Sequence, residues 1–193
     1  MKQLILASGS PRRKQLLKQI GLKFKVVPSE YEEDMTLKMP PAKLAEFLSA
    51  GKANDVAEKN KNNNAVILAA DTFIVSNNKI LGKPHTKAKA FENLSQLNGK
   101  SLVVMTGFTL IDTKNNKKIT KSVATKVYFR KLTNCQLHAY INTGEPLDKA
   151  GAFAIQGRGA ALIKKIEGDY FNVVGLPLAA VLDELRKFNI KPL

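Results

Sequence analysis

The sequence predicts an α/β fold built on a mixed β-sheet. Its first 21 residues read as a short apolar strand, a small polar turn and a helix with apolar residues at helical spacing. Residues 65–70 form an apolar run of strand length, which fits a strand buried on both faces of a sheet. Two long β-rich segments, 101–111 and 119–130, flank a polar turn, and such an antiparallel pair argues against a purely parallel sheet.

Length and composition predict a soluble globular protein. With 193 residues the chain can bury a full core, as one domain or as two small lobes. No apolar run approaches the ~20 residues of a membrane span, and the N-terminus lacks a signal pattern, so we expect no membrane partner. Cys135 is the only cysteine, which predicts no disulfide framework and a cytoplasmic location. One cysteine and two histidines argue against zinc and favour a hard, oxygen-bound cation such as Mg²⁺ or Mn²⁺.

The charge balance predicts an anionic partner. The chain has 31 Lys and Arg against 16 Asp and Glu, a formal net charge of +15. Such a field favours nucleic acids or phosphorylated small molecules. The basic residues are scattered, Trp is absent and the four Tyr are dispersed. The chain therefore lacks the interleaved aromatic residues of a platform for single-stranded nucleic acid.

The first predicted turn is a candidate anion site. Residues 8–10 form a small polar turn after the first strand, with Ser10 as the expected N-cap of a helix that begins at Pro11 and with Gly21 at its expected C-terminal end. Free backbone N–H groups and the helix dipole attract anions at such a turn.

Two arginines strengthen this hypothesis. Arg12 and Arg13 lie in the first turn of the predicted helix, and a guanidinium group matches phosphate oxygens two at a time. The segment therefore predicts a phosphate site. The alternative is an ordinary strand-to-helix turn whose arginines are solvated.

The next elements contain an acidic segment and a lysine. Residues 24–27 read as a second strand, and residues 29–39 contain the only dense acidic cluster, which includes Glu33. A solvated loop is the simplest interpretation of this cluster, but one of its carboxylates is also a candidate for holding a metal or a sugar hydroxyl. Residues 40–41 then start a helix that contains Lys52. The predicted apolar face of this helix is Leu44, Phe47 and Leu48.

Asp71 and Thr72 follow directly after the apolar run of residues 65–70. An acidic residue just past the end of a buried strand is where α/β proteins place catalytic or metal-binding groups. The alternative is an aspartate that caps the following turn. A hairpin is predicted between residues 73–75 and 79–81, and the turn after it holds Lys83 between a glycine and a proline.

The second half of the chain adds helices and a glycine-rich segment. Helices are predicted over residues 86–97, with Thr86 as N-cap, and over residues 133–143. Five glycines and Gln156 lie within residues 145–175, which implies close backbone approach or special dihedral angles there. A strand is predicted over residues 161–166, and a last helix follows Pro177.

These candidates favour phosphoryl chemistry. A turn with two arginines, a strand-end aspartate and turn-held lysines supply charge neutralisation and positioning, which do most of the catalysis in such reactions. The sequence contains no credible Ser-His-Asp set and no Walker A loop.

In five motifs the chain resembles the Maf family of nucleoside triphosphate pyrophosphatases. The motifs are LILASGSPRR at 4–13, AADT at 69–72, LGKP at 81–84, MTG at 105–107 and EPLDKAGAFAIQGRGAALIKKIEGDYFNVVGLPL at 145–178. They occur in the family's order and extend over nearly the whole chain, which makes the resemblance specific.

The resemblance implies a single domain over residues 1–193, with two α/β lobes around a long mixed sheet and a central cleft, similar to inosine triphosphate pyrophosphatases. It also implies hydrolysis between the α- and β-phosphates of a nucleoside triphosphate, with Mg²⁺ or Mn²⁺ as cofactor. The products are a nucleoside monophosphate and pyrophosphate. Nucleic acid is not required for this activity, and a homodimer is one of the open alternatives for the oligomeric state.

The resemblance also implies roles for individual residues. Asp71 is the expected proton acceptor. Asp71 and Glu33 together are the expected metal ligands. Phosphate binding is assigned to Ser8, Arg13, Lys52 and Lys83.

Three further residues are expected to decide which nucleotide binds. The branch of the family that acts on dTTP and UTP resembles this chain at Arg12, Thr72 and Gln156, whereas the branch that acts on 7-methylguanosine triphosphate usually differs there. A preference for dTTP and UTP, or for modified pyrimidine nucleotides, is therefore expected.

Two other functions remain open at this point. One is a basic nucleic-acid-binding protein, which only the net charge motivates. The other is a non-catalytic role in cell division, which the family's older name, septum formation inhibitor, suggests. Asp71 and Arg13 discriminate between these and the enzyme, because a binder driven by charge has no use for a strand-end carboxylate.

Overall fold

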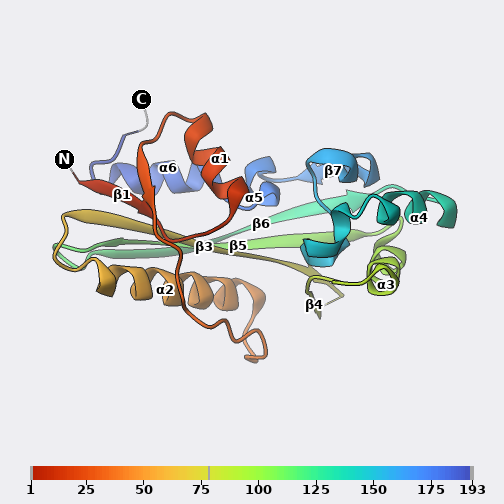
Figure 1. Ribbon diagram of the computed structural model, residues 1–193, viewed down its shortest axis with the longest axis horizontal. Helices are drawn as coiled ribbons and strands as arrows, with labels where there is room; N and C mark the ends of the chain where they lie inside the picture. The colour runs from red at the N-terminus through yellow and green to blue at the C-terminus, as the bar shows by residue number, and fades with distance from the viewer. Residues whose placement is uncertain (1, 78, 192–193) are drawn as a thin grey trace. The chain divides into compact units, whose positions relative to one another are not determined.

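The computed structural model describes residues 2–77 and 79–191 (Figure 1). Its strands are β1 (Gln3–Leu6), β2 (Phe24–Val26), β3 (Ala65–Ser76), β4 (Lys79–Leu81), β5 (Ser101–Asp112), β6 (Lys118–Phe129) and β7 (Ile163–Glu167). Its α-helices are α1 (Pro11–Gln19), α2 (Pro41–Lys59), α3 (Lys87–Leu97), α4 (Asn134–Asn142), α5 (Tyr170–Val174) and α6 (Leu178–Arg186). Three 3₁₀ turns, η1 (Glu145–Asp148), η2 (Ala150–Ala152) and η3 (Gly157–Leu162), lie in the glycine-rich segment.

The strands form one mixed sheet in the order β2-β1-β3-β5-β6-β7, with β4 paired to β3. β1 is parallel to β2 and to β3, whereas β4 is antiparallel to β3 and β7 to β6. Ala65 bonds to Thr113 and Thr72 to Thr106, so β3 and β5 also run antiparallel. The predicted mixed α/β fold is therefore confirmed.

The chain divides into two compact units, and β3, β5 and β6 contribute residues to both. The first unit comprises residues 2–72, 106–123 and 175–191, and the second comprises residues 73–105 and 124–174.

In the first unit, helices cover both faces of the sheet. α2 lies on one face, and α1 and α6 lie on the other (Figure 1). Ala53 and Val56 of α2 pack in one buried cluster with strand residues that include Ile67 and Ala69. Because side chains alternate along a strand, the odd-numbered residues of β3 face α2 and the even-numbered residues face away from it.

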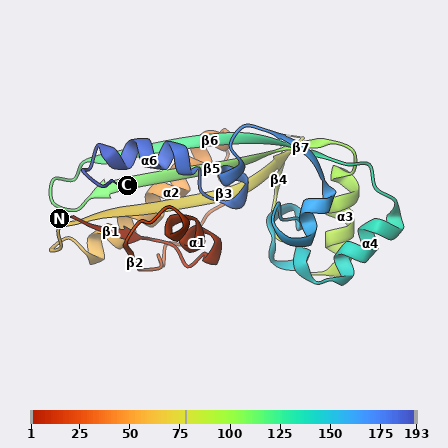
Figure 2. The same ribbon diagram turned by 90° about the horizontal axis from the view of Figure 1, so that it is seen from above.

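The second unit has its own apolar core. α3 and α4 pack against each other (Figure 2). Leu94 and Leu137 from these helices share a buried cluster with Val127 and Phe129 of β6. Threonines cap both helices as their sequence predicts: Thr86 Oγ1 accepts a hydrogen bond from Lys89 N, and Thr133 forms a capping box with Gln136.

Several boundaries differ from the prediction. β3 does not end at Ala70 but continues to Ser76, so the predicted strand 65–70 and the predicted hairpin strand 73–75 form one strand, and its last residues pair with β4 as expected. Ser10 is the N-cap of α1, but its hydroxyl makes no capping hydrogen bond. Residues 161–162 belong to η3, so β7 begins later than predicted, and Phe47 is exposed although it was assigned to the core face of α2.

Candidate active site

Asp71 lies inside β3, not past its end, and it is 5% exposed. β1 stops its pairing where Leu6 lies opposite Leu68, and Ala7 N adds one bond to Leu68 O. β3 therefore continues beyond the end of its parallel neighbour, and Asp71 is carried on that continuation. Asp71 faces α2, like Ile67 and Ala69, whereas Thr72 faces the other side of the sheet.

Lys52 of α2 connects two carboxylates. Its Nζ lies 2.5 Å from Asp71 Oδ1 and 2.6 Å from Glu33 Oε1. The side chains of Lys52 and Asp71 are 13% and 8% exposed, whereas that of Glu33 is 41% exposed. One ammonium group thus gathers the aspartate of β3 and a glutamate of the acidic segment, which are 38 positions apart in the sequence.

Arg13 holds three segments together on the side of the sheet that Thr72 faces. Its Nε donates to Gly175 O at 2.9 Å, its Nη1 to Ser8 Oγ at 3.1 Å and its Nη2 to Thr72 Oγ1 at 3.1 Å. A guanidinium group has five N–H donors, and these three bonds leave one N–H on Nη1 and one on Nη2 for a further acceptor.

Electrostatics connect the arginine with the carboxylates. Burial lowers the pKa of Arg13, and the negative charges of Asp71 and Glu33 oppose this effect. Because the guanidinium is the most basic side chain in proteins and has carboxylates nearby, Arg13 stays charged at neutral pH.

The turn before α1 is organised by Ser8. Its Oγ accepts hydrogen bonds from Arg13 Nη1 and from Ser10 N, the latter at 3.2 Å. Because Ser10 supplies no side-chain cap, the first turn of α1 keeps backbone N–H groups available to an anion. Phosphate binding at this turn stays a prediction.

The structure brings together some predicted site residues and not others. Within the first unit it joins Ser8, Arg13 and Thr72 in one hydrogen-bonded group and Glu33, Lys52 and Asp71 in another. Arg12 lies beside them on α1 and is partly buried. Lys83 and Gln156 belong to the second unit, where Lys83 is exposed and Gln156 is partly buried.

Sequence reasoning missed two partners in this site. Gly175 O accepts from Arg13 Nε and, at 3.2 Å, from Thr72 Oγ1. Thr106 Oγ1 shares a hydrogen bond of 2.9 Å with Thr72 Oγ1. Both residues lie in motifs that were recognised, MTG and the end of the glycine-rich segment, but a backbone carbonyl carries no sequence signal of its own.

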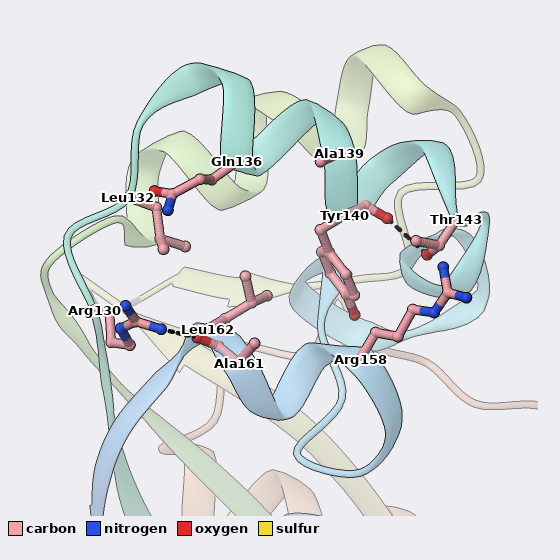
Figure 3. A pocket seen from close by; sticks show the side chains of 9 residues that line it. All are labelled: Arg130, Leu132, Gln136, Ala139, Tyr140, Thr143, Arg158, Ala161 and Leu162. Atoms are coloured by element: carbon pink, nitrogen blue, oxygen red, sulfur yellow. Dashed lines mark hydrogen bonds between the residues drawn. The ribbon is translucent and has the colours of Figure 1, made fainter.

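The second unit contains a separate cavity of about 340 Å³ (Figure 3). It lies between α4 and η3, and none of the predicted site residues lines it. Three of its lining side chains bond within the unit: Tyr140 OH donates to Glu145, Thr143 Oγ1 donates to Tyr140 O and Arg130 Nη1 donates to Ala161 O. Burial and the charge of Glu145 raise the pKa of Tyr140, so its hydroxyl stays a donor at neutral pH. The cavity is therefore not the candidate site.

The described part of the chain contains neither a preformed three-residue metal cluster nor a membrane-spanning helix. Within 2–77 and 79–191, no three His, Cys, Asp or Glu side chains form a metal-binding cluster. Over the same ranges, no helix is long and apolar enough to cross a bilayer.

Comparisons with known proteins give consistent matches. The model of the family described as Maf-like protein matches residues 3–188. The dTTP/UTP pyrophosphatase of Methanosarcina barkeri is 48% identical over 98% of this chain and 96% of its own length. The dTTP/UTP pyrophosphatase of Moorella thermoacetica is 45% identical over 98% of this chain and 97% of its own length. Among solved structures, a nucleoside-triphosphatase (dITP/XTP pyrophosphatase) of Mycobacterium abscessus is 13% identical with a TM-score of 0.47, covering 96% of this chain and 97% of that chain.

Proposed function

This chain belongs to the Maf-like protein family, and we propose that it is a nucleoside triphosphate pyrophosphatase that hydrolyses dTTP and UTP. Water adds to the α-phosphorus, the bond from this phosphorus to the bridging oxygen breaks, and a nucleoside monophosphate and pyrophosphate leave. The observation that carries the proposal is the buried pair of Asp71 and Lys52 beside the Arg13 cluster. It combines a carboxylate that can accept a proton with cations that can neutralise phosphate charge.

In this mechanism Asp71 accepts the proton that the attacking water loses. Lys52 is its ion-pair partner, and a lysine at this point also presents N–H donors to phosphate oxygens. Ser8, Arg13, Lys52 and Lys83 are the proposed phosphate ligands. For Arg13, the two N–H groups that its three protein bonds leave are the ones available for this task.

Asp71 and Glu33 are the proposed metal ligands. Their carboxylates converge on the same Lys52 Nζ, so they already sit around a positive charge. Mg²⁺ and Mn²⁺ are commonly held by one or two carboxylates, with water and substrate phosphate oxygens completing the coordination. The donor set thus fits such an ion, which would neutralise charge on the triphosphate when bound.

Arg12, Thr72 and Gln156 are the proposed determinants of base choice. The amide of Gln156 can both donate and accept hydrogen bonds, which suits the carbonyl and N3–H groups of a pyrimidine. We also propose that the enzyme acts in the cytoplasm, where its nucleotide substrates are found and where a lone cysteine stays reduced.

One assay tests the activity and the role of Asp71 together. Purified protein with Mg²⁺ or Mn²⁺ is given canonical and modified triphosphates, and pyrophosphate release is measured. We expect release from dTTP and UTP, and we expect Asp71→Asn to lower kcat about 10²–10⁴-fold while nucleotide binding and the circular dichroism spectrum are retained.

Two outcomes would contradict the proposal. Release from none of the triphosphates would remove the enzyme assignment and favour a binder driven by the net charge. Hydrolysis of dTTP by Asp71→Asn at the parent rate would show that another group accepts the proton.

A further inference from the structure

We propose that Asp55 and Gly51 of α2 are positioning residues that dock the acidic segment 29–33 onto the helix and so set where Glu33 meets Lys52. The inference rests on the proposed function, because Glu33 matters only if its carboxylate serves the reaction. Segment 29–33 and α2 both belong to the first unit, so all the contacts that dock the segment lie within that unit.

Asp55 anchors the start of the segment. Its Oδ2 accepts a hydrogen bond from Ser29 Oγ at 2.8 Å and from Glu30 N at 2.8 Å. Ser29 Oγ in turn accepts from Tyr31 N at 3.0 Å. An ionised carboxylate that accepts a backbone N–H and a hydroxyl makes stronger bonds than a neutral acceptor. Three consecutive residues are thereby fixed to one side chain of α2.

Gly51 provides the second contact, through the ring of Tyr31. A Cβ atom built at Gly51 would lie 2.4 Å from Tyr31 Cζ and 2.5 and 2.6 Å from its two Cε atoms. The ring therefore lies directly on the helix backbone, closer than any other residue type at this position would allow. Glycine is a poor helix former, so its presence inside α2 calls for a packing reason, and the ring supplies one.

The spacing of the two contacts agrees with an extended segment that runs along the helix, and residues 29–33 are called the strap below. Asp55 and Gly51 are four residues apart, so they share one face of α2 and differ in height by about 6 Å. Ser29 and Tyr31 are two residues apart, and two residues of extended chain span about 6.6 Å. The segment thus runs toward the N-terminal end of α2 as its own numbering rises.

This direction places Glu33 within reach of Lys52. Helical side chains lean toward the N-terminus of their helix, so the Lys52 ammonium is displaced in the direction that the strap follows. Glu33 is 41% exposed at its side chain and has Lys52 as an ion-pair partner at 2.6 Å. The backbone path fixed by Asp55 and Tyr31, more than packing around Glu33 itself, therefore determines where this carboxylate lies.

The test compares Asp55→Ala with Glu58→Ala, a control that removes the same charge from an exposed position of the same helix. Amide hydrogen exchange measures the docking of residues 29–33 on α2 and does not depend on enzymatic activity. We expect the amides of Glu30 and Tyr31 to be protected in the parent and in Glu58→Ala, and to lose protection in Asp55→Ala. Equal protection in all three proteins would overturn the docking by Asp55.

The affinity for the metal ion tests whether this docking positions Glu33. We expect Asp55→Ala to weaken Mn²⁺ binding, followed by electron paramagnetic resonance, and to raise the Mg²⁺ concentration for half-maximal pyrophosphate release about tenfold. Glu58→Ala should leave both unchanged. If Asp55→Ala lost amide protection but bound Mn²⁺ like the parent, the link from the strap to Glu33 would be wrong.

The ring contact has its own pair of variants. Tyr31→Ala should weaken Mn²⁺ binding as Asp55→Ala does, whereas Tyr31→Phe keeps the ring on Gly51 and should keep the protection of residues 30 and 31. If the parent protein had no pyrophosphatase activity, the proposed function would be refuted. The hydrogen-exchange and Mn²⁺ measurements would still show whether segment 29–33 docks on α2 and positions Glu33.

Discussion

Among single residues, Arg13 connects three separate segments of the chain in the candidate site. It bonds to the turn after β1, to β3 and to the carbonyl of Gly175, which are 5, 59 and 162 positions away in the sequence. The planar guanidinium has N–H donors on three separate nitrogen atoms, so this one side chain reaches three acceptors that lie in different directions. Arg13 therefore shapes the site as well as offering N–H groups to a phosphate.

Arg13→Lys tests this double role. The ammonium keeps the charge and has three N–H donors, but all three are on one nitrogen atom, which cannot replace the fork that reaches Ser8, Thr72 and Gly175. We expect kcat/KM for dTTP to fall at least tenfold, which is roughly 1.4 kcal/mol, and the free energy of unfolding in urea to fall by about 1–3 kcal/mol.

The control for this variant is Lys18→Ala, an exposed residue on the same helix. It should change neither quantity. If Arg13→Lys lowered kcat/KM while its stability stayed at the parent value, Arg13 would act on the substrate alone and not as a cross-link.

Among elements, α2 and α6 are attached to the sheet by different means. α2 approaches β5 so closely that a Cβ at Gly107 would lie 2.0 Å from Ala45 O, so steric fit decides its position. α6 is tied by Glu184, which is 2% exposed and lies 2.7 Å from Lys121 Nζ and 2.9 Å from Lys187 Nζ. Charge pairing therefore adds to the apolar packing of α6.

Glu184 predicts a pH dependence of stability. The hydrogen bond from Lys121 lowers the pKa of Glu184, burial opposes this, and Lys187 adds to the lowering. Since the folded pKa is below that of the unfolded chain, the stabilisation is complete above about pH 4.3 and is lost as the pH falls through the folded pKa.

Glu184→Gln measures this contribution. At pH 7 we expect the variant to unfold in urea with about 1–3 kcal/mol less free energy than the parent, and the difference should shrink as the pH is lowered below 4. A difference that was constant from pH 7 to pH 3 would mean that the charge of Glu184 contributes nothing.

At the level of the whole molecule, the net charge of +15 is the dominant feature. A nucleoside triphosphate carries about four negative charges near neutral pH, so a positive field raises its encounter rate with the enzyme. Salt screens this long-range attraction but affects short ion pairs in a buried site much less.

We therefore expect kcat/KM for dTTP to fall several-fold when KCl is raised from about 50 to about 500 mM at constant Mg²⁺. The change should reside in KM, and kcat should stay nearly constant. Sucrose at matched viscosity serves as the control for diffusion. A kcat/KM that did not respond to salt would show that only local contacts recognise the substrate.

Much of the fold follows from local patterns in the sequence. The strand-turn-helix of residues 4–21, the threonine caps at positions 86 and 133 and the hairpin to β4 were all predicted because each depends on neighbours within a few residues. Asn78 of that hairpin lies outside the described residues. The break predicted after Ala70 was wrong: residues 65–70 and 73–75 belong to one strand, which continues through Asp71 and Thr72, and Thr72 bonds to Thr106 of β5, a long-range partner that local periodicity cannot reveal.

The sequence by itself determined the fold class, the family and the residue types of the site. Only the tertiary structure decided which of them meet. Asp71 and Lys52 are 19 positions apart, and they touch because α2 packs on the face of the sheet to which the odd-numbered residues of β3 point. Thr72, one residue later, points the other way and bonds to Arg13. The alternation of a strand is local, but which helix covers each face depends on long-range packing.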